Sequence, residues 1–286
     1  MAPTLVLPND FYIFTTLRVE PKNDAGWAAS QDSSEMHLIF FPYHLARLRD
    51  AARTFSLATV SDLLADDETG PKLLREKVEA AIPDKARPWR IRMTIDRQGR
   101  IDATAAPIPD AQGLLLTLPR NPSGLSLFEF FSAARTDYKG RIWDVTVDDK
   151  PTPKSIFTGH KTSVRGMYSA ARERAGLTSL AEPKEVLVWN GDGEVMEGSI
   201  TTVYFRRKLR QPGDTNGQSG WAWVTPSLSS GCNAGSTRRY ALSAGVCVEG
   251  TVEVDGLVDG EEFWLSNAVN GFFLGKISLS QKPARP

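Results

Sequence analysis

The final third of the chain constrains the fold most, because short runs of β-branched and aromatic residues follow one another there, separated by turn-forming residues. These runs predict strands at residues 203–207, 221–225, 252–254, 262–265 and 271–277. Between the first two, a glycine-rich polar stretch at 211–220 predicts an exposed hairpin loop. The last part of the chain is therefore expected to form a strand-dominated unit.

The first part of the chain mixes strands with helices. Runs of aromatic and β-branched residues predict strands, and alternation of apolar with polar residues predicts a hairpin. The expected elements are strands at 11–19 and 37–41 with a turn at 21–26 between them, and a hairpin with arms at 91–95 and 101–105.

Apolar residues at three- and four-residue steps predict two helices before that hairpin. The second helix is expected to begin at Pro71, where a missing N–H costs nothing, and to end at Pro83. The residues that share a face are Leu45, Leu48, Ala52 and Phe55 in the first helix and Leu74, Val78 and Ile82 in the second.

Regular patterns weaken between residues 118 and 141, where prolines and a glycine interrupt the chain. We place the domain boundary there, with a small α/β domain at 1–120, a linker region at 121–141 and a larger domain at 142–286. The larger domain is expected to hold a strand at 142–147, a helix closed by Gly176 and a strand at 186–189 before the strand-rich part. The fold class is therefore α+β.

Composition excludes several classes of protein. The chain has 286 residues, 34 basic and 34 acidic, so no overall positive field favours nucleic acid or an acidic membrane. Two cysteines rule out a disulfide framework and fit the reducing cytoplasm. Three scattered histidines give no metal-ligand spacing, so no metal is expected. No signal-like or long apolar run predicts secretion or membrane insertion.

Three chemical groups occur in a fixed order along the chain. Lys161 supplies an amine, Glu197 a carboxylate at a Gly-Ser turn, and Gly235-Ser236-Thr237 a hydroxyl-rich turn before a helix-like run. A pyridoxal phosphate site requires these three groups: an amine for the Schiff base, a carboxylate for the pyridine nitrogen, and N–H and hydroxyl groups for the phosphate. The order therefore predicts pyridoxal 5'-phosphate as cofactor.

The chain resembles the class IV aminotransferase family of fold type IV pyridoxal phosphate enzymes, which includes branched-chain and D-amino acid transaminases and aminodeoxychorismate lyases. The resemblance implies a small α/β domain, a larger barrel-like domain, the cofactor in a cleft between them, and a homodimer. The sequence motifs that carry this resemblance are Phe14-Thr15-Thr16-Leu17-Arg18, His44-Leu45-Ala46-Arg47-Leu48, Lys161 with Arg165, Glu197-Gly198-Ser199, Gly235-Ser236-Thr237-Arg238 and Leu265-Ser266-Asn267-Ala268.

The resemblance also implies roles for the residues that hold the cofactor. Lys161, expected to open a helix, is the Schiff-base residue and proton-transfer base, and Glu197 contacts the pyridine nitrogen. Arg47, Ser236 and Thr237 contact the phosphate. Taken alone, each has a plainer reading: a solvated lysine, a turn carboxylate, a surface arginine with a buried stem, and N-cap hydroxyls.

The substrate side of the site is implied to include Thr16, Arg165 and Asn267. One position departs from the family: Thr202 stands where an asparagine is frequent, so a hydrogen bond near the site is expected to differ.

The reaction has three alternatives. The spacing of Lys161 and Arg165, and the words around Lys161 and Glu197, look most like fungal aminodeoxychorismate lyases, which convert 4-amino-4-deoxychorismate to 4-aminobenzoate and pyruvate. Branched-chain or D-amino acid transamination is the second reading. A relative that binds without turnover is the third, and retention of Lys161, Glu197 and Arg47 together argues against it.

Overall fold

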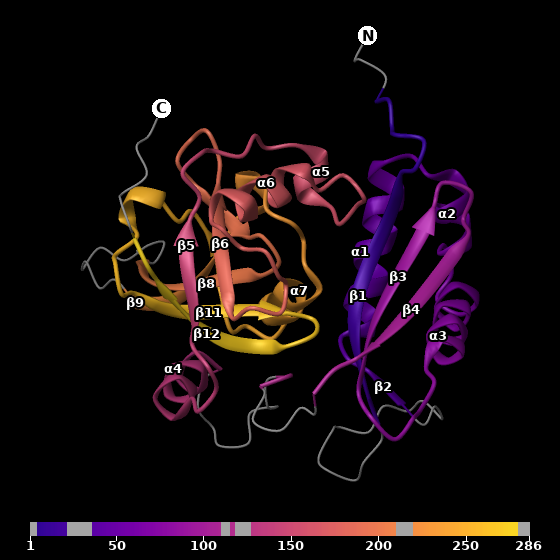
Figure 1. Ribbon diagram of the computed structural model, residues 1–286, viewed down its shortest axis with the longest axis horizontal. Coiled ribbons are helices and arrows are strands. Elements are labelled where there is room, and N and C mark those ends of the chain that lie inside the picture. The colour runs from indigo at the N-terminus through magenta and orange to yellow at the C-terminus, as the bar shows by residue number, and fades with distance from the viewer. Residues whose placement is uncertain (1–4, 22–35, 110–114, 118–126, 210–219, 280–286) are drawn as a thin grey trace. The chain divides into compact units, whose positions relative to one another are not determined.

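The chain is divided into two units in the computed structural model, which describes residues 5–21, 36–109, 115–117, 127–209 and 220–279 (Figure 1). The first unit comprises Met1–Asp110 together with His160–Arg165. The second comprises Ala111–Gly159 and Gly166–Pro286. The segment that carries Lys161 thus belongs to the first unit, although its neighbours in the chain on both sides belong to the second.

The first unit is a four-stranded antiparallel sheet with helices on one face. Its strand order is β2-β1-β3-β4, and the sheet is built around the long pairing of β1 with β3. Along β3 buried residues alternate with more exposed ones, whereas β1 is buried along nearly its whole length; α1 packs on β1, and α3 packs on β3 and β4. The elements are β1 (Tyr12–Pro21), β2 (Met36–Leu38), α1 (Phe41–Thr54), α2 (Ala58–Leu63), α3 (Thr69–Ala81), β3 (Trp89–Asp96) and β4 (Ile101–Pro107).

Sequence patterns predicted this unit well except near its helix starts. The strand expected at 37–41 ends at Leu38, because Phe40 adopts a left-handed conformation with φ 59° and α1 begins at the next residue. The short helix α2 was not predicted. Helix α3 begins two residues before Pro71, where Asp66 accepts the N–H of Thr69 at 2.5 Å. The expected turn at 21–26 lies outside the described residues except Pro21.

The second unit is an eight-stranded mixed sheet in the order β10-β9-β8-β11-β12-β5-β6-β7. The sheet curls, because the terminal strand β7 also contacts β8 and β9, near the other end of that order. This gives the expected barrel-like shape. The elements are α4 (Leu127–Asp137), β5 (Trp143–Val147), α5 (Ile156–Gly159), α6 (Gly166–Arg174), β6 (Lys184–Trp189), β7 (Val195–Gly198), β8 (Thr202–Leu209), β9 (Gly220–Pro226), η1 (Leu228–Ser230), α7 (Ser236–Ser243), β10 (Val248–Gly250), η2 (Val254–Gly256), β11 (Glu262–Asn267) and β12 (Gly271–Ile277).

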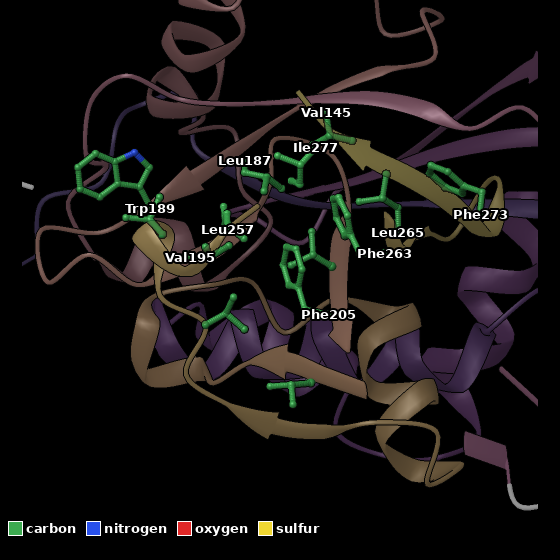
Figure 2. Packing of buried hydrophobic residues seen from close by; sticks show 14 residues of the cluster. Val145, Leu187, Trp189, Val195, Phe205, Leu257, Phe263, Leu265, Phe273 and Ile277 are labelled. Carbon is green, nitrogen blue, oxygen red and sulfur yellow. The ribbon is translucent and has the colours of Figure 1, made fainter. Parts of the chain in front are cut away.

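The curled sheet encloses an apolar core, shown in Figure 2. Phe205 of β8 and Phe263 of β11 stack at its centre with ring centroids 4.4 Å apart, and Leu187 and Leu265 pack into the same cluster. Burying one such side chain contributes roughly 1.5–3 kcal/mol. The core thereby fixes β6, β8 and β11. Of these, β6 pairs with the strand that carries Glu197, and β11 carries Asn267.

Two expectations for the second unit need correction. The strand expected at 252–254 is reduced to a single antiparallel bridge of Glu253 with Glu194, because the 3-10 helix η2 begins at Val254; β10 lies earlier, where it pairs in parallel with β9. The side chains of Val252 and Val254 are buried in the core, and their backbone is bonded to the chain just before and within β7: the N–H of Val195 donates to the Val252 carbonyl at 2.7 Å, and the N–H of Val254 donates to the Gly193 carbonyl at 2.8 Å. The stretch expected as a linker contains α4, and its first residues lie outside the described part of the chain, as does the expected loop at 211–220 except Gly220.

Candidate active site

Lys161 is fixed at the edge of the first unit's sheet. The N–H of Phe14 donates to the Lys161 carbonyl at 3.0 Å, and the N–H of Ser163 donates to the Tyr12 carbonyl at 2.9 Å. Residues 161–163 thereby extend the sheet beside β1, with Thr162 opposite Ile13. The prediction that Lys161 opens a helix is wrong, because the backbone here pairs as an edge strand and α6 begins only at Gly166.

The side chain of Lys161 shares an aromatic neighbour with a second cation. Its Nζ lies 5.3 Å from the centroid of the Phe14 ring, and the guanidinium carbon of Arg92 lies 3.9 Å from the same centroid. Arg92 is opposite Thr16 in the β1–β3 register and donates to the hydroxyl of Tyr12 at 3.1 Å. The sequence motifs did not include Arg92. The one indication of it in the sequence is that it stands among the polar residues that alternate with apolar ones along the predicted strand.

Arg47 is buried against the same sheet. It lies on α1 and donates to the hydroxyl oxygen of Thr15, which lies 2.6 Å from Nδ1 of His44. Burial, followed by the positive charges of Arg47 and Lys161, holds the pKa of His44 well below its usual value. The imidazole is therefore neutral near pH 7, and it lies beside the Thr15 hydroxyl to which Arg47 donates. Because the Arg47 side chain is buried, Arg47 is not the surface arginine that its plainer reading allowed.

Glu197 is held in the second unit by a tyrosine. It lies on β7 opposite Val188, and its side chain is buried. The hydroxyl of Tyr168, on α6, lies 2.5 Å from Oε1 of Glu197 and 3.3 Å from the carbonyl of Thr158. Because a carboxylate is the stronger acceptor, the single phenolic hydrogen is directed to Glu197. The structure thus places a buried, oriented carboxylate where the sequence predicted one.

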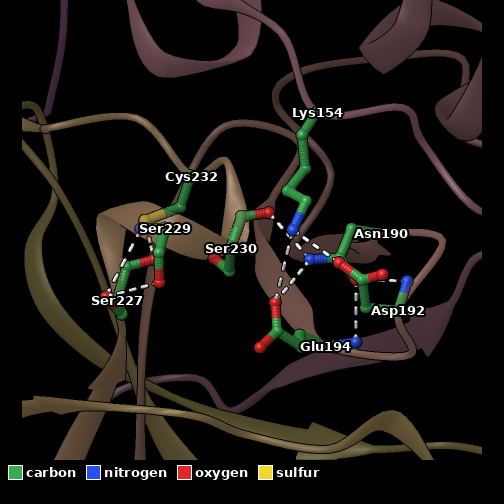
Figure 3. Close-up of polar contacts among 8 residues, drawn as sticks. All are labelled: Lys154, Asn190, Asp192, Glu194, Ser227, Ser229, Ser230 and Cys232. Carbon is green, nitrogen blue, oxygen red and sulfur yellow. Dashed lines mark hydrogen bonds and ion pairs between the residues drawn. The ribbon is translucent and has the colours of Figure 1, made fainter.

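The turn that leads into β7 is a separate polar cluster, shown in Figure 3. Asn190 donates to Glu194 at 2.7 Å and to the carbonyl of Ser230 at 2.9 Å. Lys154 pairs with Asp192 at 2.5 Å, and this hydrogen bond raises the pKa of Lys154. A lysine held protonated in this way is a poor amine nucleophile. Burial raises the pKa of the nearby Cys232 to about 12, so its thiolate is also unavailable.

Ser236 and Thr237 form the first turn of α7, with Gly235 as N-cap. Both side chains are buried, and Thr237 accepts a hydrogen bond from Ser266 at 2.7 Å. Ser266 in turn lies 2.8 Å from the hydroxyl of Tyr204. The N–H groups of a first helical turn have no partner within the helix, so this end of α7 has the chemistry of an anion site.

Three predicted positions have local surroundings of their own. The hydroxyl of Thr202 packs against the turn before α7, since a Cβ added to Gly235 would lie 3.1 Å from its oxygen. Asn267 uses its side-chain oxygen to accept the N–H of Val269 at 3.0 Å and closes the β11–β12 hairpin. Arg165 is half-buried and belongs to the first unit with Lys161.

Each unit thus holds its own part of the predicted set. The first holds Lys161, Arg47, Thr16 and Arg165, and the second holds Glu197, Ser236, Thr237 and Asn267. Within the described ranges, no group of His, Cys, Asp or Glu side chains could hold a metal ion. Among the helices that the structure describes, none is long and apolar enough to cross a membrane.

Comparison with known proteins gives consistent matches. Residues 13–274 match the model of the amino-transferase class IV family. The chain is 31% identical over 230 residues to the aminodeoxychorismate lyase of Saccharomyces cerevisiae, a match that covers 75% of this chain and 58% of the yeast protein. The chain therefore spans little more than half the length of that relative.

Solved structures share the fold. The structure of a "putative amino-acid aminotransferase" from Mesorhizobium loti has a TM-score of 0.64 at 23% identity and covers 94% of this chain and all of its own. The branched-chain amino acid aminotransferase of Escherichia coli has a TM-score of 0.55 at 16% identity and covers 96% of this chain and 78% of its own. The α+β fold expected from sequence is confirmed by these likenesses.

Proposed function

Because the chain belongs to the class IV aminotransferase family of pyridoxal phosphate enzymes, as its ordered motifs predicted, we propose that it is an aminodeoxychorismate lyase. The proposed reaction converts 4-amino-4-deoxychorismate to 4-aminobenzoate and pyruvate. The observation that supports the lyase outcome most is the 31% identity to the yeast lyase, which extends over three quarters of this chain. Fold alone would not distinguish this outcome from transamination.

The donor set of the chain fits pyridoxal phosphate. Lys161 offers the amine that would hold the cofactor covalently, and Glu197 offers a buried carboxylate for the ring nitrogen. Arg47 and the hydroxyls of Ser236 and Thr237 offer the donors that a phosphate needs. When bound, the cofactor supplies an electron sink that stabilises negative charge on the substrate carbon next to the amine.

In this proposal each residue has a separate task, and both units contribute residues. Lys161, whose backbone is anchored on β1, moves the proton at the substrate carbon that bears the amine. Glu197, oriented by Tyr168, keeps the ring nitrogen protonated. The first turn of α7 and the guanidinium of Arg47 bind the phosphate and so fix the position of the ring.

The substrate carries two carboxylates, and the first unit offers cations for them. Arg92 lies beside the same Phe14 ring as Lys161, and Arg165 follows Lys161 in the same segment. We assign the substrate's carboxylates to Arg92 and Arg165, with Thr16 and Asn267 as neutral hydrogen-bonding groups. This assignment adds Arg92 to the residues that sequence motifs indicated.

A direct assay tests the proposal. Purified protein loaded with pyridoxal phosphate is incubated with 4-amino-4-deoxychorismate, and 4-aminobenzoate and pyruvate are measured. Equal amounts of both products, absent in Lys161→Ala, are expected. If branched-chain or D-amino acids instead convert the cofactor to its amine form and no 4-aminobenzoate appears, the protein is a transaminase and the lyase proposal is wrong.

Assembly and location complete the proposal. The family resemblance supports a homodimer, which light scattering of the purified protein would test. Cys232 and Cys247 are both free and buried, in keeping with the cytoplasm as a reducing compartment. Fluorescence microscopy of the tagged protein in its own cells would test that location.

A further inference from the structure

The turn that follows Glu197 is built around a second carboxylate, that of Glu185 on β6, whose side chain is fully buried. Five donors converge on this carboxylate, and four of them come from the three turn residues that join β7 to β8. Oε1 accepts the N–H of Val186 at 2.8 Å, the N–H of Ser199 at 3.0 Å and the hydroxyl of Ser199 at 2.6 Å, and Oε2 accepts the N–H of Ile200 at 3.1 Å and the hydroxyl of Thr201 at 2.8 Å.

An arginine balances the charge of Glu185. Arg172, on α6, has Nη1 3.9 Å from Oε1 of Glu185 and donates from the same nitrogen to the hydroxyl of Ser199 at 3.1 Å. Its other terminal nitrogen donates to the carbonyl of Ser179 at 2.8 Å, which fixes the guanidinium. A buried carboxylate with five donors and an adjacent cation is well satisfied, so it can serve as a rigid support.

The glycine of the turn is required by the same carboxylate. A Cβ added to Gly198 would lie 2.7 Å from Oε2 of Glu185 and would also collide with the hydroxyl of Thr201. The backbone of Gly198 therefore packs directly on the carboxylate. In the motif Glu197-Gly198-Ser199-Ile200-Thr201, the glycine, the serine and the threonine all contact Glu185, which accounts for these residue types.

We propose that Glu185 is a positioning residue for Glu197. Gly198 pairs with Leu187 and Glu197 pairs with Val188, so Glu197 is placed by strand pairing on one side and by the turn on the other. Glu185 fixes that turn through three consecutive residues, and the position of the Glu197 carboxylate depends on it. The inference rests on the proposed function, because it assigns Glu185 a part in the same site.

The first test uses Glu185→Gln, which keeps the side-chain length but replaces one acceptor oxygen with an NH₂ group that faces donors. In the variant without cofactor, the amide hydrogens of Ser199 and Ile200 are expected to exchange faster, because both donate to Glu185. In the loaded variant, kcat is expected to fall by about tenfold to a hundredfold, the cost of a displacement near 1 Å, with KM nearly unchanged. The pKa of the bound cofactor's ring nitrogen is expected to fall, because a displaced Glu197 stabilises the ring proton less.

A second pair of variants keeps the proposal testable if Glu185→Gln does not fold. Thr201→Val removes one of the five donors at nearly constant volume. It is expected to change amide exchange at the turn, kcat and the titration of the cofactor's ring nitrogen in the same direction as Glu185→Gln, but by less. Thr201→Ser restores the hydroxyl and should restore wild-type behaviour. The matched control is Glu261→Gln, which breaks the ion pair of a partly buried glutamate elsewhere in the same unit with Arg207 and should leave the titration of the cofactor's ring nitrogen unchanged.

The outcomes separate this inference from the proposed function. Lowered thermal stability in Glu185→Gln and Thr201→Val, with amide exchange at the turn, kcat and cofactor titration all at wild-type values, would show that Glu185 is only structural. Glu197→Gln is measured in parallel. If that variant itself has the wild-type titration and turnover, the role proposed for Glu197 fails; if it is impaired while both Glu185→Gln and Thr201→Val are not, only the positioning role fails.

Discussion

At the scale of single residues, the candidate site consists of buried polar groups whose partners are already in place. Arg47 contacts Thr15, Glu197 accepts from Tyr168, and Thr237 accepts from Ser266. Such pre-set hydrogen bonds reduce the reorganisation that binding requires. Thr15 and Ser266 already stand in the sequence motifs, whereas Tyr168 became visible as a partner only in the structure.

Lys161→Ala should abolish turnover and the covalent attachment of cofactor while leaving the fold intact, because the contacts that hold residues 161–163 are made by the backbone. Borohydride reduction of the loaded wild-type protein followed by peptide mapping should label Lys161. Lys154→Ala is the control, since Lys154 is held in an exposed ion pair and should be dispensable for activity. Label on a different lysine would contradict the assignment.

Tyr168→Phe should slow turnover without loss of cofactor, because it removes the hydrogen bond to Glu197 and leaves the ring packing in place. A hydrogen bond to a charged group contributes roughly 1.5–3 kcal/mol, or about ten- to a hundredfold in rate. Steady-state kinetics across a pH series is the measurement. Tyr138→Phe, which removes a hydroxyl bonded to the Arg141 carbonyl, should leave the profile unchanged.

His44 predicts a pH dependence of stability. Its pKa in the folded protein lies well below 6.5, its usual value, so below pH 6.5 the unfolded chain binds a proton that the folded protein does not. The free energy of unfolding should therefore fall as pH decreases from 6.5, by at most about 1.4 kcal/mol per pH unit from this group. Urea denaturation of wild type and His44→Gln should show a shallower dependence in the variant. Equal slopes would mean that His44 is not the titrating group.

At the scale of elements, the predictions succeeded where local periodicity and tertiary pairing agree. The alternation at Ile91, Met93 and Ile95 predicted β3 because one face of that strand is buried. The alternating valines at 252 and 254 are also buried, but only Glu253 between them forms a β-bridge, with Glu194, and the 3-10 helix η2 begins at Val254, so no full strand forms. Lys161 was placed in a helix because its pairing partner, β1, is remote in sequence, and such contacts leave no local pattern.

The β11–β12 hairpin, which carries Ser266 and Asn267, depends on Gly271. Gly271 has φ 67°, and a Cβ there would collide with the backbone of Leu115 and Leu116. Gly271→Ala should therefore destabilise the protein by clearly more than the roughly 1–2 kcal/mol that a left-handed alanine costs. Gly245→Ala provides the comparison, because Gly245 has φ 69° and nothing within 4 Å of an added Cβ. Equal losses of unfolding free energy in urea would refute the steric argument.

At the scale of the whole molecule, the predicted site residues are distributed over both units. No sequence pattern predicted that division in detail, because the return of residues 160–165 to the first unit interrupts the second. The expected boundaries followed chain order, and the structure instead divides the chain after Asp110 and makes this one exchange. The pairing between segments that are distant in the chain determines this division, and composition does not.

Cofactor binding should stabilise both units together if each contributes ligands, as proposed. At a free cofactor concentration a hundredfold above Kd, binding adds about 2.7 kcal/mol to the unfolding free energy. Differential scanning calorimetry with and without pyridoxal phosphate is the measurement. A rise in Tm of one transition alone, with a second transition unmoved, would show that a single unit holds the cofactor.

The edge pairing of β1 with residues 161–163 also has a consequence during synthesis on the ribosome. The four strands of the first unit's sheet are complete once Pro107 has been translated. The N–H of Phe14 and the carbonyl of Tyr12, however, have no partner from residues 161–163 until those residues have left the ribosome. Until then that end of β1 is an open edge, the kind of surface on which nascent chains aggregate. The same short segment that carries the reactive amine therefore also protects this edge of the nascent chain.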